Sequence, residues 1–157
     1  MLAAVLVQTT VLPQLTLFGA APDLVLLVTI SMGLLEGPLA GAATGFAGGL
    51  LEDLLLTTVT GITALAYLLV GYAVGKIRPY VQSTSVLVPV TGIFIGTVAA
   101  NLLLAALAVL LGSPTPAMER VLQAAMLMAV YNAIIAPFVY PVVRKAASFR
   151  TEKTARW

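Results

Sequence analysis

Residues 37–53 read GPLAGAATGFAGGLLED, and this stretch decides the fold. Gly37, Gly41, Gly45, Gly49 and Asp53 follow one another at intervals of four. Glycine at every fourth position clears a groove along a helix, so that a second backbone can come close. In a straight helix each step of four drifts by about 40°, so only part of the stripe can face a single neighbour. The stretch therefore predicts a tightly packed helix.

The composition places this helix in a membrane. The chain has 157 residues, of which 61% are hydrophobic and 9% charged, and its mean hydropathy is +1.07. A soluble domain is about 45–50% apolar and about 25% charged. The apolar excess cannot be buried in one soluble core, so most of it must face lipid. Short alternating strands, the mark of an outer-membrane barrel, are not visible. We expect an all-α polytopic membrane protein.

Six apolar segments follow one another along the chain. They cover residues 2–18, 24–35, 39–56, 61–75, 86–111 and 117–143. A spanning helix needs about 20 residues, so the second and fourth segments are short for a full span. The first lacks the basic start and cleavage site of a secretory signal and is expected to be a retained helix. We therefore expect about six transmembrane helices in one domain, residues 1–143, and a short basic cytoplasmic tail, residues 144–157.

The basic residues predict the orientation of these helices. One cluster, Lys76 and Arg78, lies between the fourth and fifth segments, and a larger one lies in the tail. Two segments separate the clusters, so both lie on one side, which the positive-inside rule makes cytoplasmic. With four segments before Lys76, the N-terminus is also inside. The tail is too short and too mixed for a nucleic-acid site and is expected to contact anionic lipid.

Glu52 and Asp53 are candidate site residues, because charged side chains are costly in such an apolar chain. As neighbours on a helix they point about 100° apart, so alone they cannot form a paired-carboxylate site. They could line a cavity, contact a partner, or lie at a wet or capped helix end. The nearby Gly41, Gly45 and Gly49 could pack against the protein's own helices or against a partner's transmembrane helix.

Two amides and a proline interrupt the last two apolar segments. Asn101 and Asn132 are candidate intramembrane polar contacts, since such amides usually bond another helix, at about 0.6 kcal/mol each. Pro137 is expected to kink the sixth helix.

Several classes of chemistry are excluded by what the sequence lacks. It contains neither cysteine nor histidine, which removes thiol catalysis, Cys/His metal sites and imidazole acid–base chemistry. It also contains no P-loop, HExxH, GxSxG or kinase signature. We therefore predict no catalytic residues, no cofactor and no metal.

The motifs, in this order, resemble the MreD family of bacterial rod shape-determining membrane proteins. The resemblance covers nearly the whole chain and is carried by short groups in four places. These are Gln8-Thr9-Thr10 with Pro13 and Pro22-Asp23-Leu24; Gly45-Phe46 with Gly49-Leu50-Leu51-Glu52-Asp53 and Gly61; Tyr67 with Gly71-Tyr72; and Tyr131-Asn132 with Pro137 and Arg144-Lys145. One departure is that only seven residues precede Gln8, whereas family members usually have more.

The resemblance implies a role without catalysis. Such proteins are expected to be scaffolds in the bacterial inner membrane, within the elongation machinery that guides side-wall peptidoglycan synthesis. They are expected to bind the transmembrane or juxtamembrane part of MreC, a bitopic protein, in an assembly with MreB, RodA and a class B penicillin-binding protein. The implied fold is similar to the six-helix substrate-binding subunits of energy-coupling-factor transporters.

That similarity supplies an alternative function. The protein could instead be the substrate-binding membrane subunit of a vitamin-type transporter. Glu52, Asp53, Asn101 and Asn132 would then be the few polar contacts of a mostly apolar pocket. The two hypotheses differ in what co-purifies with the protein: a bitopic partner, or a small molecule with an ATPase module.

Overall fold

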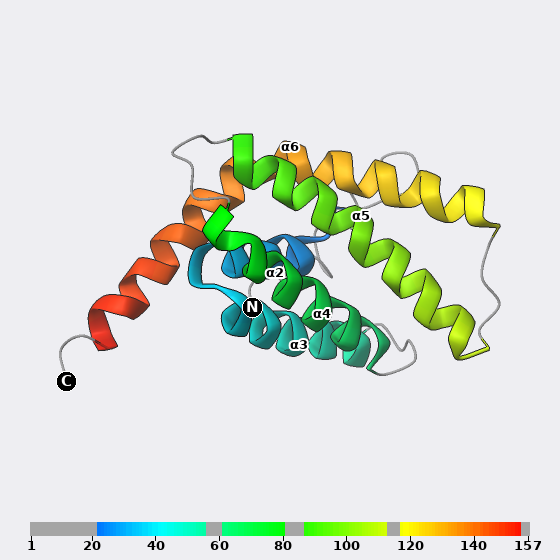
Figure 1. Ribbon diagram of the computed structural model, residues 1–157, viewed down its shortest axis with the longest axis horizontal. Helices are drawn as coiled ribbons and strands as arrows, with labels where there is room; N and C mark the ends of the chain where they lie inside the picture. Colours follow the sequence, from blue (N-terminus) through cyan, green and yellow to red (C-terminus); the bar gives the residue numbers. More distant parts are fainter. Residues whose placement is uncertain (1–21, 56–60, 81–86, 113–116, 155–157) are drawn as a thin grey trace.

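The computed structural model describes residues 22–55, 61–80, 87–112 and 117–154, and the predicted first helix at 2–18 lies outside them. Every regular element in the described ranges is helical (Figure 1). The α-helices are α2 (Leu24–Glu36), α3 (Pro38–Leu55), α4 (Ile62–Ile77), α5 (Leu87–Leu110) and α6 (Met118–Thr154), and a short 3₁₀ helix, η2 (Arg78–Tyr80), follows α4. The last five apolar segments thus correspond to five α-helices.

The short helix α2 forms the centre of the bundle. It packs against α3, α4, α5 and α6, and its Leu26, Leu27 and Ile30 side chains are fully buried. Asp23 caps its N-terminus by accepting a hydrogen bond from the Leu26 N–H. Gly37 ends the helix with a φ of 102°, a backbone conformation that favours glycine, and Pro38 then begins α3.

Helices α5 and α6 form the second layer and are longer than the rest (Figure 1). The segments Pro89–Leu110 and Met118–Ser148 are long and apolar enough to cross a membrane. An exposed apolar stripe runs along α6 at every fourth position: Met118, Leu122, Met126, Val130, Ile134, Phe138 and Val142.

Helix α6 extends past the end predicted for it at Val143. It continues to Thr154, because residues 144–154 contain neither glycine nor proline and include good helix formers. Val143 and Ala147 are buried and pack with Met32 of α2, which anchors the extension. Pro137 and Pro141 both lie within the helix, and Figure 1 shows that α6 changes direction along its orange part.

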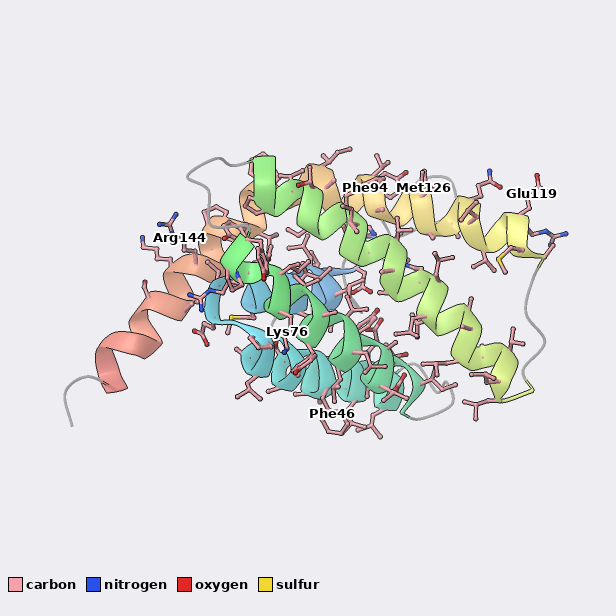
Figure 2. The ribbon with its side chains drawn as sticks, in the orientation of Figure 1. Phe46, Lys76, Phe94, Glu119, Met126 and Arg144 are labelled. Carbon is pink, nitrogen blue, oxygen red and sulfur yellow. The ribbon has the colours of Figure 1, made fainter. Side chains whose placement is uncertain are left out.

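The antiparallel helices bring three of the acids to one end of the bundle and four of the bases to the other. We call Asp23, Glu52 and Asp53 the acidic end; they lie at the start of α2 and near the end of α3. We call Lys76, Arg78, Arg144 and Lys145 the basic end; Lys76 lies in the last turn of α4 and Arg78 begins η2. In Figure 2, Arg144 lies on α6 at the left of the view, and Lys76 lies on α4 nearer the centre.

Candidate functional site

The three candidate glycines of α3 lie against α4. Gly41, Gly45 and Gly49 are all buried. A Cβ atom added to Gly41 would lie 2.8 Å from the carbonyl carbon of Gly71, and one added to Gly49 would lie 2.6 Å from the Cα of Ala64. One added to Gly45 would meet the backbone of Tyr67 at similarly close range. Since backbone cannot move aside as a flexible side chain can, only glycine fits at these positions.

Helix α2 joins the same contact through its own glycine. A Cβ atom on Gly33 would lie 2.8 Å from the Gly71 carbonyl oxygen, and one on Gly71 would lie 2.9 Å from Cγ2 of Thr29. At the other end of the contact between α3 and α4, a Cβ on Gly75 would lie 2.6 Å from the Gly37 carbonyl carbon. The glycines therefore allow three backbones of this chain to approach closely.

The opposite face of α3 is uncovered within the described residues, where α3 packs only on α2 and α4. Leu39 is 80% exposed, Leu54 is 62% exposed, and Phe46 lies between them along the helix (Figure 2). Ala43 and Ala47 are exposed on the same face, four residues apart. We call these five residues the outward face of α3. It combines small and large apolar side chains.

Asp53 caps a helix other than its own. Its carboxylate oxygen Oδ2 accepts hydrogen bonds from the Gly61 N–H at 2.8 Å and the Ala64 N–H at 3.2 Å. Gly61 is the N-cap residue of α4, adopts a left-handed conformation, and has no side chain to do this itself. Asp53 is only 1% exposed. It therefore fixes the end of α3 to the start of α4 and complements the positive end of the α4 dipole.

Glu52 lies beside this cap and is partly buried. Its carboxyl group interacts electrostatically with those of Asp23 and Asp53. The three acids of the acidic end therefore lie close together, although they come from two helices. Within the described residues, no group of three His, Cys, Asp or Glu side chains has a geometry that could hold a metal ion.

Asn132 belongs to a buried polar network that joins four helices. Its Oδ1 accepts a hydrogen bond from the Asp23 backbone N–H at 2.9 Å, and its Nδ2 donates to Oγ1 of Thr97 at 3.1 Å. The hydroxyl of Tyr67 donates to Oδ2 of Asp23. Asp23 thus links α2 to α4 through Tyr67 and to α6 through Asn132, which in turn reaches Thr97 on α5.

Asn101 extends this network by one turn of α5. Its Nδ2 donates to the Thr97 carbonyl oxygen at 2.9 Å and to Sδ of Met128 on α6 at 3.4 Å. The structure thus brings Asn101 and Asn132 together through Thr97, which sequence reasoning did not single out. Nothing in the sequence around Thr97 distinguishes it as a site residue. In the structure its hydroxyl also donates to the Ile93 carbonyl oxygen of its own helix.

Two other members of the network were missed as site residues. In the sequence, Asp23 served only to mark the start of the second apolar segment and to carry the family resemblance, and Tyr67 only to carry the resemblance. The signal for Asp23 was available, because an acid directly before an apolar run is a typical N-cap. All these contacts connect one part of the chain to another, so the arrangement is suited to holding helices in place.

Comparisons with known proteins give the family of the chain, although no curated protein and no solved structure matches it. The family model described as rod shape-determining protein MreD matches residues 1–149, nearly the whole chain. This match, with the two helices able to cross a membrane, supports a membrane protein with a role in cell shape. The chain therefore belongs to the MreD family of rod shape-determining proteins.

Proposed function

We propose that the protein is a non-catalytic membrane scaffold of the cell-elongation machinery. It would bind the transmembrane or juxtamembrane part of an MreC-like bitopic protein and thereby help guide side-wall peptidoglycan synthesis. The observation that carries the proposal is the outward face of α3, an apolar surface with two alanines four residues apart. Family membership supports the cellular role.

The outward face suits a partner helix better than the other surfaces do. Between helices in a membrane, small residues four apart permit close backbone approach. The glycine face of α3 is filled by α4 and α2, so a partner's helix has no access to it. The exposed stripe of α6 carries large side chains such as Met126 and Phe138, which suit lipid contact. Ala43 and Ala47 are therefore the centre of the proposed interface.

The remaining features of the proposal follow from the family and the charge pattern. Residues 2–18 would supply a sixth transmembrane helix, and the fold would be similar to that of the substrate-binding subunits of energy-coupling-factor transporters. Residues 1–143 would form the membrane domain and 144–157 the cytoplasmic tail. The protein would lie in the bacterial inner membrane, with both termini on its cytoplasmic side. MreB, RodA and a class B penicillin-binding protein would belong to the same assembly.

A matched pair of substitutions on α3 tests the interface. Ala47→Leu adds bulk to the outward face, and we expect it to leave the fold intact but to weaken co-purification with the MreC-like partner about tenfold, because overpacking costs about 1–3 kcal/mol. Gly45→Leu adds the same side chain two residues away, against the α4 backbone, and we expect little folded protein. Met126→Leu, on the exposed stripe of α6, is the control and should change neither property.

The result that would contradict the interface is normal partner recovery with Ala47→Leu. If Met126→Leu lowered recovery instead, the partner would bind α6. The assay is affinity purification in mild detergent, with a thermal unfolding curve for each variant to separate lost binding from lost folding.

The transporter hypothesis receives less support. It needs Glu52, Asp53, Asn101 and Asn132 to be directed at a ligand. Asp53 and Asn132 are instead buried and hydrogen-bonded to other parts of the chain. Mass spectrometry of the same purified sample decides between the two, since a vitamin-like molecule recovered with ATP-hydrolysing subunits would overturn the scaffold proposal.

A further inference from the structure

The buried polar network gives the helices a common level from which their lengths can be compared. Tyr67 of α4 and Asn132 of α6 both bond to Asp23 at the start of α2, and Thr97 of α5 bonds to Asn132. A helix rises about 1.5 Å per residue. The number of residues from the network to each helix end therefore measures how far that helix extends.

Toward the basic end the helices extend equally far. Helix α4 ends at Ile77, α5 begins at Leu87, and the exposed apolar stripe of α6 ends at Val142. Each of these residues is ten positions from the network residue of its own helix, or about 15 Å along the axis. The apolar surface of the bundle therefore ends at one level here.

Toward the acidic end the helices differ in length. Helix α5 continues to Leu110 and α6 begins at Met118, each about 20 Å from the network. Helix α4 begins at Ile62, only about 8 Å from Tyr67, and α3 ends close to it because Asp53 caps α4. In Figure 1 the yellow-green end of α5 and the yellow start of α6 reach past α3 and α4. The α3–α4 pair is thus shorter by about 12 Å.

The exposed apolar surfaces of the two pairs differ in the same way. On α6 the exposed stripe runs from Met118 to Val142, about 36 Å, which exceeds the hydrocarbon core of about 30 Å. On α3 the exposed apolar side chains run from Leu39 to Leu55, about 24 Å. A bilayer that fits α5 and α6 is therefore too thick for α3 and α4.

The protein itself has little means of removing this mismatch. Tilting shortens the span of all the helices together, so it cannot match a long and a short pair at once. The pairs cannot slide past each other while the hydrogen bonds of the network hold them. At the acidic end, the described parts of α3 and α4 carry no lysine or arginine whose long side chain could reach a more distant headgroup layer.

We propose that the bilayer thins beside the α3–α4 pair, in the leaflet at the acidic end, and that this side of the protein selects lipids with short acyl chains. Hydrocarbon of full thickness would cover the polar start of α4, where backbone groups need hydrogen-bond partners. The selection concerns the length of the acyl chains and not the charge of the headgroup. It does not depend on the partner proposed for α3.

Tryptophan quenching by brominated lipids measures this selection on each side of the protein. The single tryptophan of the chain, Trp157, is first changed to phenylalanine. Leu69→Trp then reports on α4 and Ile134→Trp on α6, because both residues are exposed and each follows the network residue of its helix by two positions. Each full-length variant is reconstituted without a partner in mixtures of brominated dimyristoleoyl phosphatidylcholine and unlabelled dioleoyl phosphatidylcholine.

We expect the lipid preference to differ between the two reporters. Quenching of Leu69→Trp should show about a threefold preference for the short lipid, because mismatch raises the cost of the long lipid on this side. Quenching of Ile134→Trp should show no such preference. Exchanging the bromine label between the two lipids controls for an effect of the label itself.

Two results would overturn the proposal. An equal preference at the two positions would show that the bilayer has the same thickness on both sides of the protein. Weak quenching of Leu69→Trp by either lipid would show that another copy of the chain covers α4 in place of lipid. If thermal unfolding in detergent shows that Leu69→Trp does not fold, Leu65→Trp, also exposed on α4, replaces it.

Discussion

The acidic and basic ends of the bundle differ in the burial and hydrogen bonding of their charged side chains. At the acidic end, Asp23 and Asp53 are buried and accept hydrogen bonds from backbone N–H groups at the starts of α2 and α4. At the basic end, Lys76, Arg144 and Lys145 are exposed, and no described carboxylate pairs with them. The chain thus satisfies its buried acids internally and presents its bases outward.

This difference separates polar residues that stabilise the fold from those available to bind lipid or a partner. A buried carboxylate is costly unless it receives hydrogen bonds, and the positive end of a helix dipole supplies them. Such a residue is evidence about stability. An exposed basic residue at a helix end costs little and gains its energy from lipid or a partner. Substitutions at the acidic end should therefore change stability, and those at the basic end should change binding.

Among substitutions of the charged residues at the two ends, the largest effect on stability is expected from Asp23→Ala. This change removes the N-cap of α2 and leaves the buried Tyr67 hydroxyl without its acceptor. Lost caps cost about 0.5–2 kcal/mol and unsatisfied buried groups about 1–3 kcal/mol, so we expect a loss of about 2–4 kcal/mol. Tyr67→Phe is the control, because it removes the hydroxyl but keeps the cap.

Thermal and denaturant unfolding in detergent measure both variants. The comparison between the two ends would fail if Asp23→Ala unfolded at the same midpoint as the unmodified protein. A loss no larger than that of Tyr67→Phe would show that the cap contributes nothing.

A smaller effect is expected from Asp53→Asn, and it should exceed that of Glu52→Gln. The asparagine keeps an oxygen acceptor for the α4 N-terminus but loses the charge that strengthens the bond, at about 1 kcal/mol. Glu52 is less buried than Asp53, and glutamine keeps almost the same shape, so this change should cost less than about 0.5 kcal/mol. The same unfolding assay applies, and equal tolerance of both changes would remove the special role of Asp53.

The sequence was a good guide to the helices because their signals are local. Apolar runs bounded by Pro22-Asp23, Gly37-Pro38 and Gly61 predicted segments at 24–35, 39–56 and 61–75, and the structure has α2, α3 and α4 at nearly these positions. Glycine and proline fix such boundaries through backbone geometry, which needs no knowledge of the tertiary fold. The end of α6 was missed because basic residues change the hydropathy without breaking the helix.

The partners of the polar residues could not be read from local patterns. Asp23 and Asn132 are 109 residues apart in sequence, and nothing near either residue indicates the other. Asp53 was recognised as unusual, but a cap supplied across a helix boundary to Gly61 and Ala64 depends on the tight pairing of α3 and α4. The glycines spaced four apart in α3 likewise predicted close packing but did not identify α4 as the neighbouring helix. Contacts of this kind are decided by how the helices pack.

The smallest effect on stability is expected from Arg144→Gln at the basic end. Arg144 is exposed, so in detergent without added lipid its loss should change the free energy of unfolding by less than about 0.5 kcal/mol. A ligand that binds only the folded state stabilises it in proportion to the logarithm of its concentration over its dissociation constant. Exposed basic residues at a helix end attract anionic lipid, so adding phosphatidylglycerol should stabilise the unmodified protein and Asp23→Ala alike, but stabilise Arg144→Gln less. An equal lipid effect in all three would mean that the bases serve only to orient the helices, and that the contrast between the ends concerns topology alone.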